Sequence, residues 1–173
     1  RRERQLQWGQ WAQRAAAVLA IPLLLSTFYL WMNGNGQSKV NFIEIRTNPG
    51  MITSTTLPDG TYVTLNSNST IIYPSHFDKE SRKVQLNGEA YFKVKKDENH
   101  PFKVITPQKA VVKVYGTQFN VEAYADDETI TATLVEGSIA MAYENKKSNW
   151  AEQKIQPGQE IVYTATQQQI KID

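Results

Sequence analysis

The sequence predicts an all-β domain that follows one N-terminal apolar helix. Three observations lead to this fold class. Beyond residue 40, β-branched and aromatic residues alternate with polar ones, the runs are separated by turn sequences, and an uncharged stretch over residues 15–32 follows an arginine-rich start. Of the 173 residues, 40% are hydrophobic and 21% are charged, which is the composition of folded rather than disordered chains.

Residues 1–14 are predicted to form a basic, cytoplasmic juxtamembrane arm. They contain Arg1, Arg2, Arg4 and Arg14 against a single acid, a net charge of +3, whereas the rest of the chain has 15 basic and 16 acidic residues, a net of −1. A nucleic-acid surface needs clustered cationic side chains. Since the net positive charge is confined to the arm, we do not expect the exported part to bind nucleic acid.

Residues 15–32 are predicted to form a transmembrane helix. Eighteen helical residues extend about 27 Å, close to the roughly 30 Å of a bilayer's hydrocarbon core. Trp8 and Trp11 precede the stretch, and Tyr29 and Trp31 lie at its other end, as in interfacial aromatic belts. The positive-inside rule then predicts a cytoplasmic N-terminus and an exported C-terminal domain.

Residues 33–41 read as a flexible linker, because NGNGQS combines two glycines with no large apolar side chain. A cleavable signal peptide and a buried soluble helix are the alternatives to the span. The linker lacks the A-x-A pattern of a cleavage site, which favours an uncleaved span. The sequence begins at Arg1 without Met, so we expect a further cytoplasmic segment upstream.

The domain over residues 42–173 is predicted to consist of short strands and tight turns. Strand patterns occupy residues 42–47, 61–65, 90–94, 102–105, 112–115 and 119–124. Turn sequences occupy residues 48–50, 57–60, 87–88, 126–127 and 156–158. We find no helical stripe after residue 40, and about 130 residues suffice for one core.

The spacing of five glycines predicts how the strands stack. Glycines at 60, 88, 116, 137 and 158 are separated by 28, 28, 21 and 21 residues. Such intervals are typical of stacked strand–turn units, which predicts a twisted β-solenoid or roll. The alternative is a β-sandwich in which glycine simply occupies the turns.

The sequence offers little for catalysis or for binding of a cofactor or metal. It has no cysteine, and its two histidines, His76 and His100, adjoin turn sequences and are predicted to be exposed. Asp126–Glu128 is predicted to be a polar hairpin tip, since it lacks the pattern of a calcium loop. Glu89 and Glu136 are interpreted as turn and strand-edge residues rather than catalytic carboxylates. We predict no enzyme and no cofactor.

Six short motifs occur in series along the predicted domain. They are LPDGTYVTLNSNSTIIYP (57–74), R-x-V-x-L-x-G-E-A-Y-F-x-V (82–94), P-F-x-V (101–104), Y-G-T-Q-F-N-V (115–121), V-E-G-S-I (135–139) and P-G (157–158). In order and spacing they resemble the FecR family of bacterial transmembrane anti-sigma factors over residues 45–165. The chain departs from the family pattern at Lys93, at Tyr115 and at Gly158-Gln159-Glu160.

The resemblance implies a signal relay across the bacterial envelope. A ligand-loaded outer-membrane TonB-dependent transporter would contact the periplasmic β domain through its signalling domain. The membrane span would pass that state to an extracytoplasmic-function sigma factor held by a cytoplasmic segment before Arg1. A small signalling subdomain would follow Asp173, and the strand over residues 160–173 is the expected receiving edge.

The resemblance also assigns the motif residues. We expect a structural rather than a contact role for them, since glycine's usual use is backbone geometry. These residues are Pro58, Asp59, Gly60, Gly88, Glu89, Ala90, Phe92, Gly116, Thr117, Phe119, Asn120, Val121, Glu136, Gly137, Pro157 and Gly158. Two other classes stay open: a membrane-anchored envelope enzyme, and an envelope scaffold or export adaptor without a signalling role.

Overall fold

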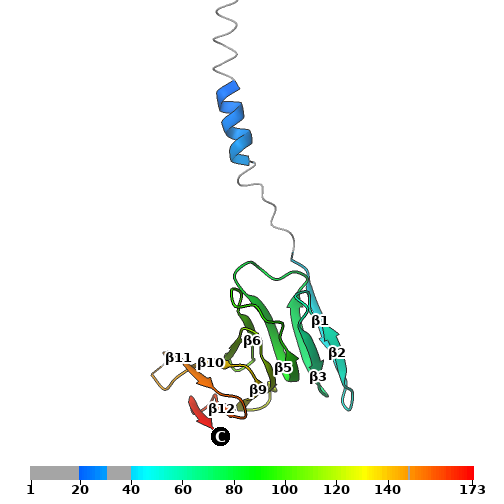
Figure 1. Cartoon of the computed structure of the whole chain (residues 1–173), viewed down its shortest axis with the longest axis vertical. Helices are drawn as coiled ribbons and strands as arrows, with labels where there is room; N and C mark the ends of the chain where they lie inside the picture. Colours follow the sequence, from blue (N-terminus) through cyan, green and yellow to red (C-terminus); the bar gives the residue numbers. More distant parts are fainter. Residues whose placement is uncertain (1–19, 31–39, 148) are drawn as a thin grey trace, which may run out of the picture. The chain divides into compact units, whose positions relative to one another are not determined.

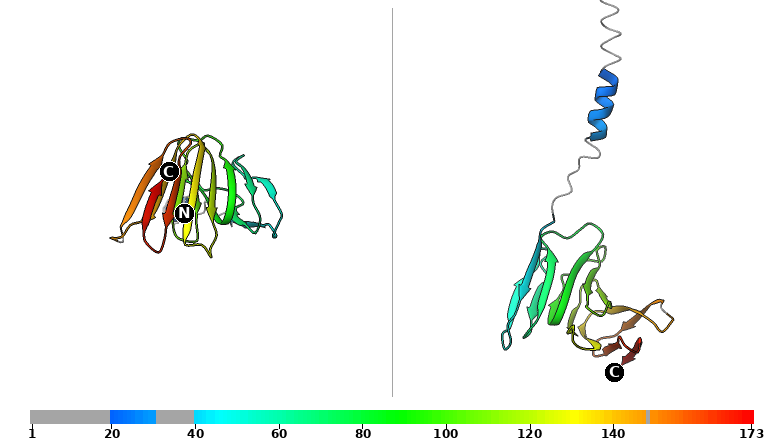
Figure 2. Two further views of the ribbon diagram at one scale, coloured as in Figure 1. Left: turned by 90° about the horizontal axis from the view of Figure 1, so that it is seen from below. Right: turned by 180° about the vertical axis from the view of Figure 1, so that it is seen from behind.

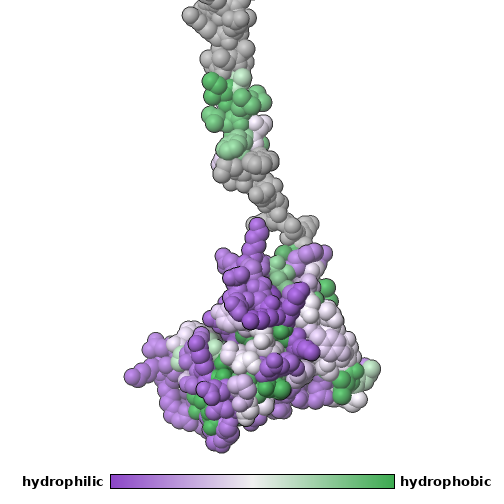
Figure 3. Space-filling model, in the orientation of Figure 1, coloured by the Kyte–Doolittle hydropathy of each residue, from purple (hydrophilic) through white to green (hydrophobic). Residues whose placement is uncertain are grey.

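The computed structural model describes residues 20–30, 40–147 and 149–173. The chain divides into two compact units, residues 1–39 and 40–173, which we describe separately. In the first unit, residues 20–30 are helical, and this segment is largely apolar and exposed (Figure 3). Within the described ranges, no helix is both long enough and apolar enough to cross a membrane.

The predicted span over residues 15–32 and its flanks lie only partly inside these ranges. Tyr29 belongs to the described helix and is exposed. The other predicted topology and anchoring residues, Arg1, Arg2, Arg4, Arg14, Trp8, Trp11 and Trp31, lie outside the described residues, as does most of the linker over residues 33–41.

The second unit is all-β, which confirms the predicted class (Figure 1). In its described residues, thirteen strands form one continuous sheet that curls back on itself into two packed layers, which we call the first and the second face. The first face has the order β1 (Phe42–Arg46), β4 (Thr70–Pro74), β5 (Arg82–Lys93), β6 (Phe102–Ile105), β7 (Val111–Val114), β10 (Ile139–Glu144), β11 (Trp150–Ile155). The second has the order β2 (Thr53–Thr56), β3 (Tyr62–Leu65), β5, β8 (Gln118–Ala123), β9 (Thr129–Glu136), β12 (Glu160–Thr164), β13 (Gln169–Ile172).

Strand β5 belongs to both faces and joins them. Its first half pairs with β4 and β6, and its second half, from Gly88 onwards, pairs with β3 and β8. Buried residues alternate without interruption with exposed or half-buried ones over its twelve residues. The strand bends back so far that Arg82, its first residue, donates a 2.8 Å hydrogen bond to the carbonyl of Lys95, just beyond its end.

The pairing pattern differs from that of a solenoid. Eleven of the twelve pairings among described strands are antiparallel, and only β5 and β6 run parallel. Stacked solenoid rungs pair in parallel. After β5 the chain instead places two strands in one face and the next two in the other. The domain is therefore a curled roll whose two faces pack like those of a sandwich. Seen from below, β11 and β13 lie at one end of the roll, and β1 and β2 lie at the other (Figure 2).

One hydrophobic cluster fills the space between the two faces. At its centre, the ring of Phe92 stacks on Phe119, with 5.1 Å between centroids, and lies 5.9 Å from Phe102. Phe92 and Phe119 belong to the second face and Phe102 to the first, so this trio ties the two faces together. Burial of each such side chain stabilises the fold by about 1.5–3 kcal/mol.

Four of the five predicted turns are turns. A backbone hydrogen bond closes each: Met51 N to Asn48 O, Gly60 N to Leu57 O, Asp127 N to Tyr124 O, and Gln159 N to Gln156 O. The prediction of a turn at Asn87–Gly88 is wrong, because these residues lie inside β5. Gly88 has a φ of 114°, so the chain bends there without leaving the sheet.

Candidate functional site

The motif glycines lie where chain segments approach each other too closely for a side chain. A Cβ atom on Gly88 would lie 2.4 Å from Ser69 Oγ, and one on Gly116 would lie 2.7 Å from Lys96 Cα. A Cβ on Gly137 would lie 2.9 Å from Thr117 Oγ1. Around Gly158, in contrast, nothing lies within 4 Å, so that position requires only the turn geometry.

Asp59 and Arg82 form a nearly buried ion pair at the end of the roll where β1 begins. The distance from Arg82 Nη1 to Asp59 Oδ2 is 2.8 Å, and the side chains are 5% and 12% exposed. Asp59 also accepts hydrogen bonds from the backbone and side chain of Thr61. Arg82 Nε donates to His100 O. The pair therefore joins the β2–β3 turn to both ends of β5.

A hollow of about 370 Å³ lies beside this pair and brings the two histidines together. Its lining includes His76, which is exposed, and His100, which is partly exposed and contacts Asp97 through a 2.8 Å hydrogen bond. That hydrogen bond is the main reason why the pKa of Asp97 is lowered from its ordinary value. Arg82 lines the same hollow, and its Nη2 atom is buried without a hydrogen-bond partner.

Glu89 organises a polar network on the outer side of the second face. It accepts hydrogen bonds from Asn66 Nδ2 and Asn120 Nδ2. On the neighbouring strand Glu122 lies directly opposite, so two carboxylates face each other across β5 and β8. Partial burial, and then the charge of Glu89, raise the pKa of Glu122. Glu136 instead accepts from Gln118, and no hydrogen bond joins it to Glu89.

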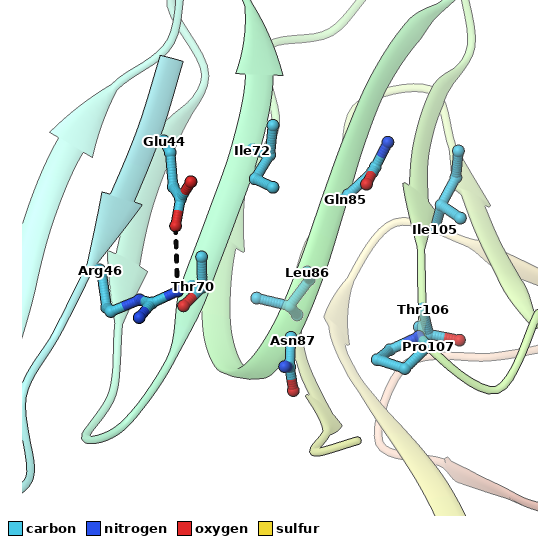
Figure 4. A pocket seen from close by; sticks show the side chains of 10 residues that line it. All are labelled: Glu44, Arg46, Thr70, Ile72, Gln85, Leu86, Asn87, Ile105, Thr106 and Pro107. Carbon is cyan, nitrogen blue, oxygen red and sulfur yellow. Dashed lines mark hydrogen bonds and ion pairs between the residues drawn. The ribbon is translucent and has the colours of Figure 1, made fainter. Parts of the chain in front are cut away.

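A second hollow, of about 390 Å³, lies on the outer side of the first face (Figure 4). Its floor includes Ile72 and Ile105, and Glu44 and Arg46 of β1 form one wall. The Glu44–Arg46 ion pair spans 3.1 Å and is exposed. In the described parts of the chain, no group of three or more histidine, aspartate or glutamate side chains is placed to hold a metal ion.

The remaining motif residues take up core or turn positions. Ala90, Phe92, Phe119 and Val121 are fully buried in the core. Thr117 is buried and donates to Ser138 O, whereas Pro58, Gly60 and Pro157 lie in turns. The Arg82 ion pair was not predicted, although its signal was present: an arginine at an inward position of a strictly alternating strand needs a buried partner.

Among the described residues, four strands of the curled sheet have a partner on one side only: β1, β2, β11 and β13. The predicted last strand over residues 160–173 is in fact a hairpin, in which β12 is interior and β13 is the edge. Glu160 and Asp173 exchange two backbone hydrogen bonds, so they form a hydrogen-bonded pair, and such pairs recur at every second residue of this hairpin. The backbone groups of Ile170 and Ile172 therefore point away from β12, toward the open edge.

The fold and its surfaces are those of a binding domain. Its polar clusters connect its own loops, and its open edges offer main-chain hydrogen-bond donors and acceptors to a partner. The sequence profile of the FecR protein family matches residues 43–140. The chain belongs to the FecR family.

Solved structures agree with this assignment. Two crystal structures of a candidate anti-sigma factor from Parabacteroides distasonis ATCC 8503 superpose on the chain with TM-scores of 0.70 and 0.69, at 35% and 36% sequence identity. The matches cover 77% and 76% of this chain but only 60% and 59% of those proteins, so the chain spans about three fifths of their length. The search of curated proteins returned no match.

Proposed function

We propose that this protein is a signal-transducing regulator of the anti-sigma class and not an enzyme. The observation that carries the proposal is the FecR family match over residues 43–140. The similarity to a solved protein described as a candidate anti-sigma factor supports it. In this proposal the β domain works by binding other proteins, and its polar clusters maintain its shape.

We further propose the route of the signal. Residues 15–32 span the inner membrane once, with the arginine-rich arm in the cytoplasm and the β domain in the periplasm; the charge asymmetry of the sequence supports this. The β domain receives the ligand-bound state of an outer-membrane TonB-dependent transporter. The signal then passes to an extracytoplasmic-function sigma factor.

Strand β13 is the proposed receiving surface. The outward backbone groups of Ile170 and Ile172 can pair with an extended segment of the transporter's signalling domain. Such pairing supplies affinity through main-chain hydrogen bonds, and Ile172, which is 36% exposed, adds apolar contact.

A transcriptional reporter tests the relay in cells. Deletion of the full-length gene should change transcription from promoters of the partner sigma factor, and Ile172→Pro should abolish the response to the transporter's ligand. Proline at residue 172 removes an outward N–H and no hydrogen bond within the domain. Thr56→Pro, which removes an outward N–H from the edge of β2, is the matched control and should respond normally.

Two results would overturn the proposal at different levels. An unchanged sigma-dependent transcriptome after gene deletion would contradict the regulatory role and favour an envelope scaffold or export adaptor that binds partners without signalling. A normal response of Ile172→Pro would contradict only β13 as the receiving edge.

A further inference from the structure

Strand β1 presents an unprotected apolar edge. Phe42 is 67% exposed and Ile43 is 40% exposed, although both lie in a strand of the domain. Proteins usually protect such edges with proline, a bulge or an inward-pointing charge. Strand β1 has none of these. Its two charges, Glu44 and Arg46, lie on the outer side and pair with each other, whereas the side chains on its inward side are Ile43 and Ile45, which lie opposite the buried Tyr73 and Ile71.

The backbone of β1 has its free hydrogen-bonding groups at the even-numbered residues. Thr47 N donates to Ser69 O, and Ser75 N donates to Asn41 O, at the two ends of the β1–β4 ladder. In an antiparallel ladder, directly hydrogen-bonded pairs recur at every second residue. Residues 41, 43, 45 and 47 therefore bond to β4, and the groups of Phe42, Glu44 and Arg46 face outwards.

The charges on the edge of β1 are complementary to those on the β1 edge of a second copy of the chain. If two copies of β1 pair in antiparallel fashion around Ile45, Glu44 of each copy lies opposite Arg46 of the other. Both residues have outward backbone groups, so these are hydrogen-bonded pairs. Registers centred on residue 44 or 46 would instead place like charges opposite each other, which destabilises a sheet.

We propose that β1 is the interface of a homodimer, in which the first faces of two copies join into one continuous sheet. The exposed Glu44–Arg46 pair within each copy is exchanged for two pairs between copies, and the partner strand covers Ile43 and Ile45. The contact is isologous, so it closes at two copies. The proposal concerns an edge other than β13 and does not depend on the signalling role.

This register is compatible with two anchors in one membrane. The two copies of Phe42 lie about 20 Å apart along the paired strands. Nine residues, the length of the linker over residues 33–41, span up to about 30 Å when extended.

Strand β11 is the competing edge and provides the internal controls. Asn145 N donates to Asn149 O, which leaves the backbone groups of Glu152 and Lys154 facing outwards around Gln153. These two charges could pair with a second β11 or with Glu44 and Arg46 of another copy. The inward residues beside them, Ala151 and Gln153, are smaller or more polar than Ile43 and Ile45 of β1. The large exposed apolar side chain of β11 is Trp150, three residues from the centre of that register.

Cysteine cross-linking in membranes tests the register, since residues 1–173 contain no cysteine, and the parent protein without a substitution is the control. In the proposed dimer the two Ile45 residues form a non-hydrogen-bonded pair with Cα atoms about 4.5 Å apart, within the range of a disulfide. The full-length Ile45→Cys protein should shift to twice its mass on a non-reducing gel. Ile43→Cys should still run at the mass of one chain on this gel, because its two copies lie about 14 Å apart in the dimer and cannot form a disulfide.

The other results of this experiment would each overturn the proposal. Cross-linking of Gln153→Cys instead of Ile45→Cys would place the interface at β11. Cross-linking only in a mixture of Ile45→Cys and Gln153→Cys would show head-to-tail chains. No cross-linking of any variant would show that β1 is not an interface between copies.

A charge swap tests the pairing independently of cysteine chemistry. Glu44→Arg alone places arginine opposite arginine twice, so the full-length protein in mild detergent should shift from dimer to monomer mass in sedimentation. The double variant Glu44→Arg/Arg46→Glu restores both opposite-charge pairs and should return the dimer. If the double variant stays monomeric, the two β1 strands do not pair with each other.

Discussion

At the scale of single residues, Gly88 shows how one position determines the shape of the domain. Its φ of 114° is a backbone conformation that residues with a side chain rarely adopt, and Ser69 fills the place of a Cβ atom. Ser69 Oγ also accepts a hydrogen bond from Glu89 N, so this close contact is part of the bend that transfers β5 from one face to the other.

Gly88→Ala should lower the free energy of unfolding by at least about 3 kcal/mol, since strain and overlap add. Gly158→Ala is the matched control: its φ is 88° but nothing lies within 4 Å, so the loss should be about 1 kcal/mol. Urea denaturation measures both values. Equal losses would show that the contact with Ser69 adds nothing to the conformational strain.

The Asp59–Arg82 pair gives a second prediction at this scale. Asp59→Asn preserves the shape of the side chain but leaves a buried guanidinium without its counter-charge, so we expect a loss of about 3 kcal/mol. Glu98→Gln breaks the exposed Lys96–Glu98 pair and should leave the unfolding free energy unchanged within error. A similar change in both variants would contradict the structural role of the buried pair.

At the scale of elements, the pairing of β5 with β8 places Glu89 opposite Glu122. Folding raises the pKa of Glu122, through partial burial and then through Glu89. When folding raises the pKa of a carboxyl group, the free energy of unfolding falls as the pH rises from the unfolded pKa of the group, about 4.3, through its folded pKa. The cost is therefore fully present at pH 7 and disappears in acid.

Glu122→Gln should accordingly stabilise the domain at pH 7, by only about 0.3–0.5 kcal/mol because Glu122 is exposed and solvent screens its interaction with Glu89. At pH 4, just below the unfolded pKa, the gain should be much smaller than at pH 7. Urea denaturation at the two pH values tests the sign, and Glu80→Gln, in the exposed β4–β5 loop, is the control. An equal gain at both pH values would assign the effect to packing rather than charge.

At the scale of the whole molecule, the proposed orientation can be tested with single cysteines. Lys147→Cys, in the exposed β10–β11 turn, should react with a membrane-impermeant maleimide once the outer membrane is permeabilised. Gln5→Cys, in the basic arm, should react only after the inner membrane is also opened. The reverse order would contradict a cytoplasmic N-terminus.

The strand pattern could be predicted because it is local. Alternation identified the all-β class and most of the early strands, and four of the five turns predicted from turn residues are turns. The second half of β5 was recognised at residues 90–94, but its first half was missed because Asn87-Gly88 has the local signature of a hairpin turn. The same glycine serves a turn or a bend, and only the neighbouring strands distinguish them.

The candidate surfaces were less predictable. Asp59 and Arg82 are 23 residues apart, and each reads locally as a turn or strand residue. The sequence predicts one strand over residues 160–173, because nothing in that stretch shows that it folds into the β12–β13 hairpin, whose second strand is the edge.

By itself, the sequence determined the all-β class, the FecR resemblance and the separation of a basic arm from a slightly acidic domain, because alternation, motif order and charge are properties of neighbouring residues. The tertiary structure alone decided where β5 bends, which charges meet in the interior and which four strands remain at an edge. These features depend on pairing between segments far apart in the chain, and pairing is settled only when the strands pack around a common core.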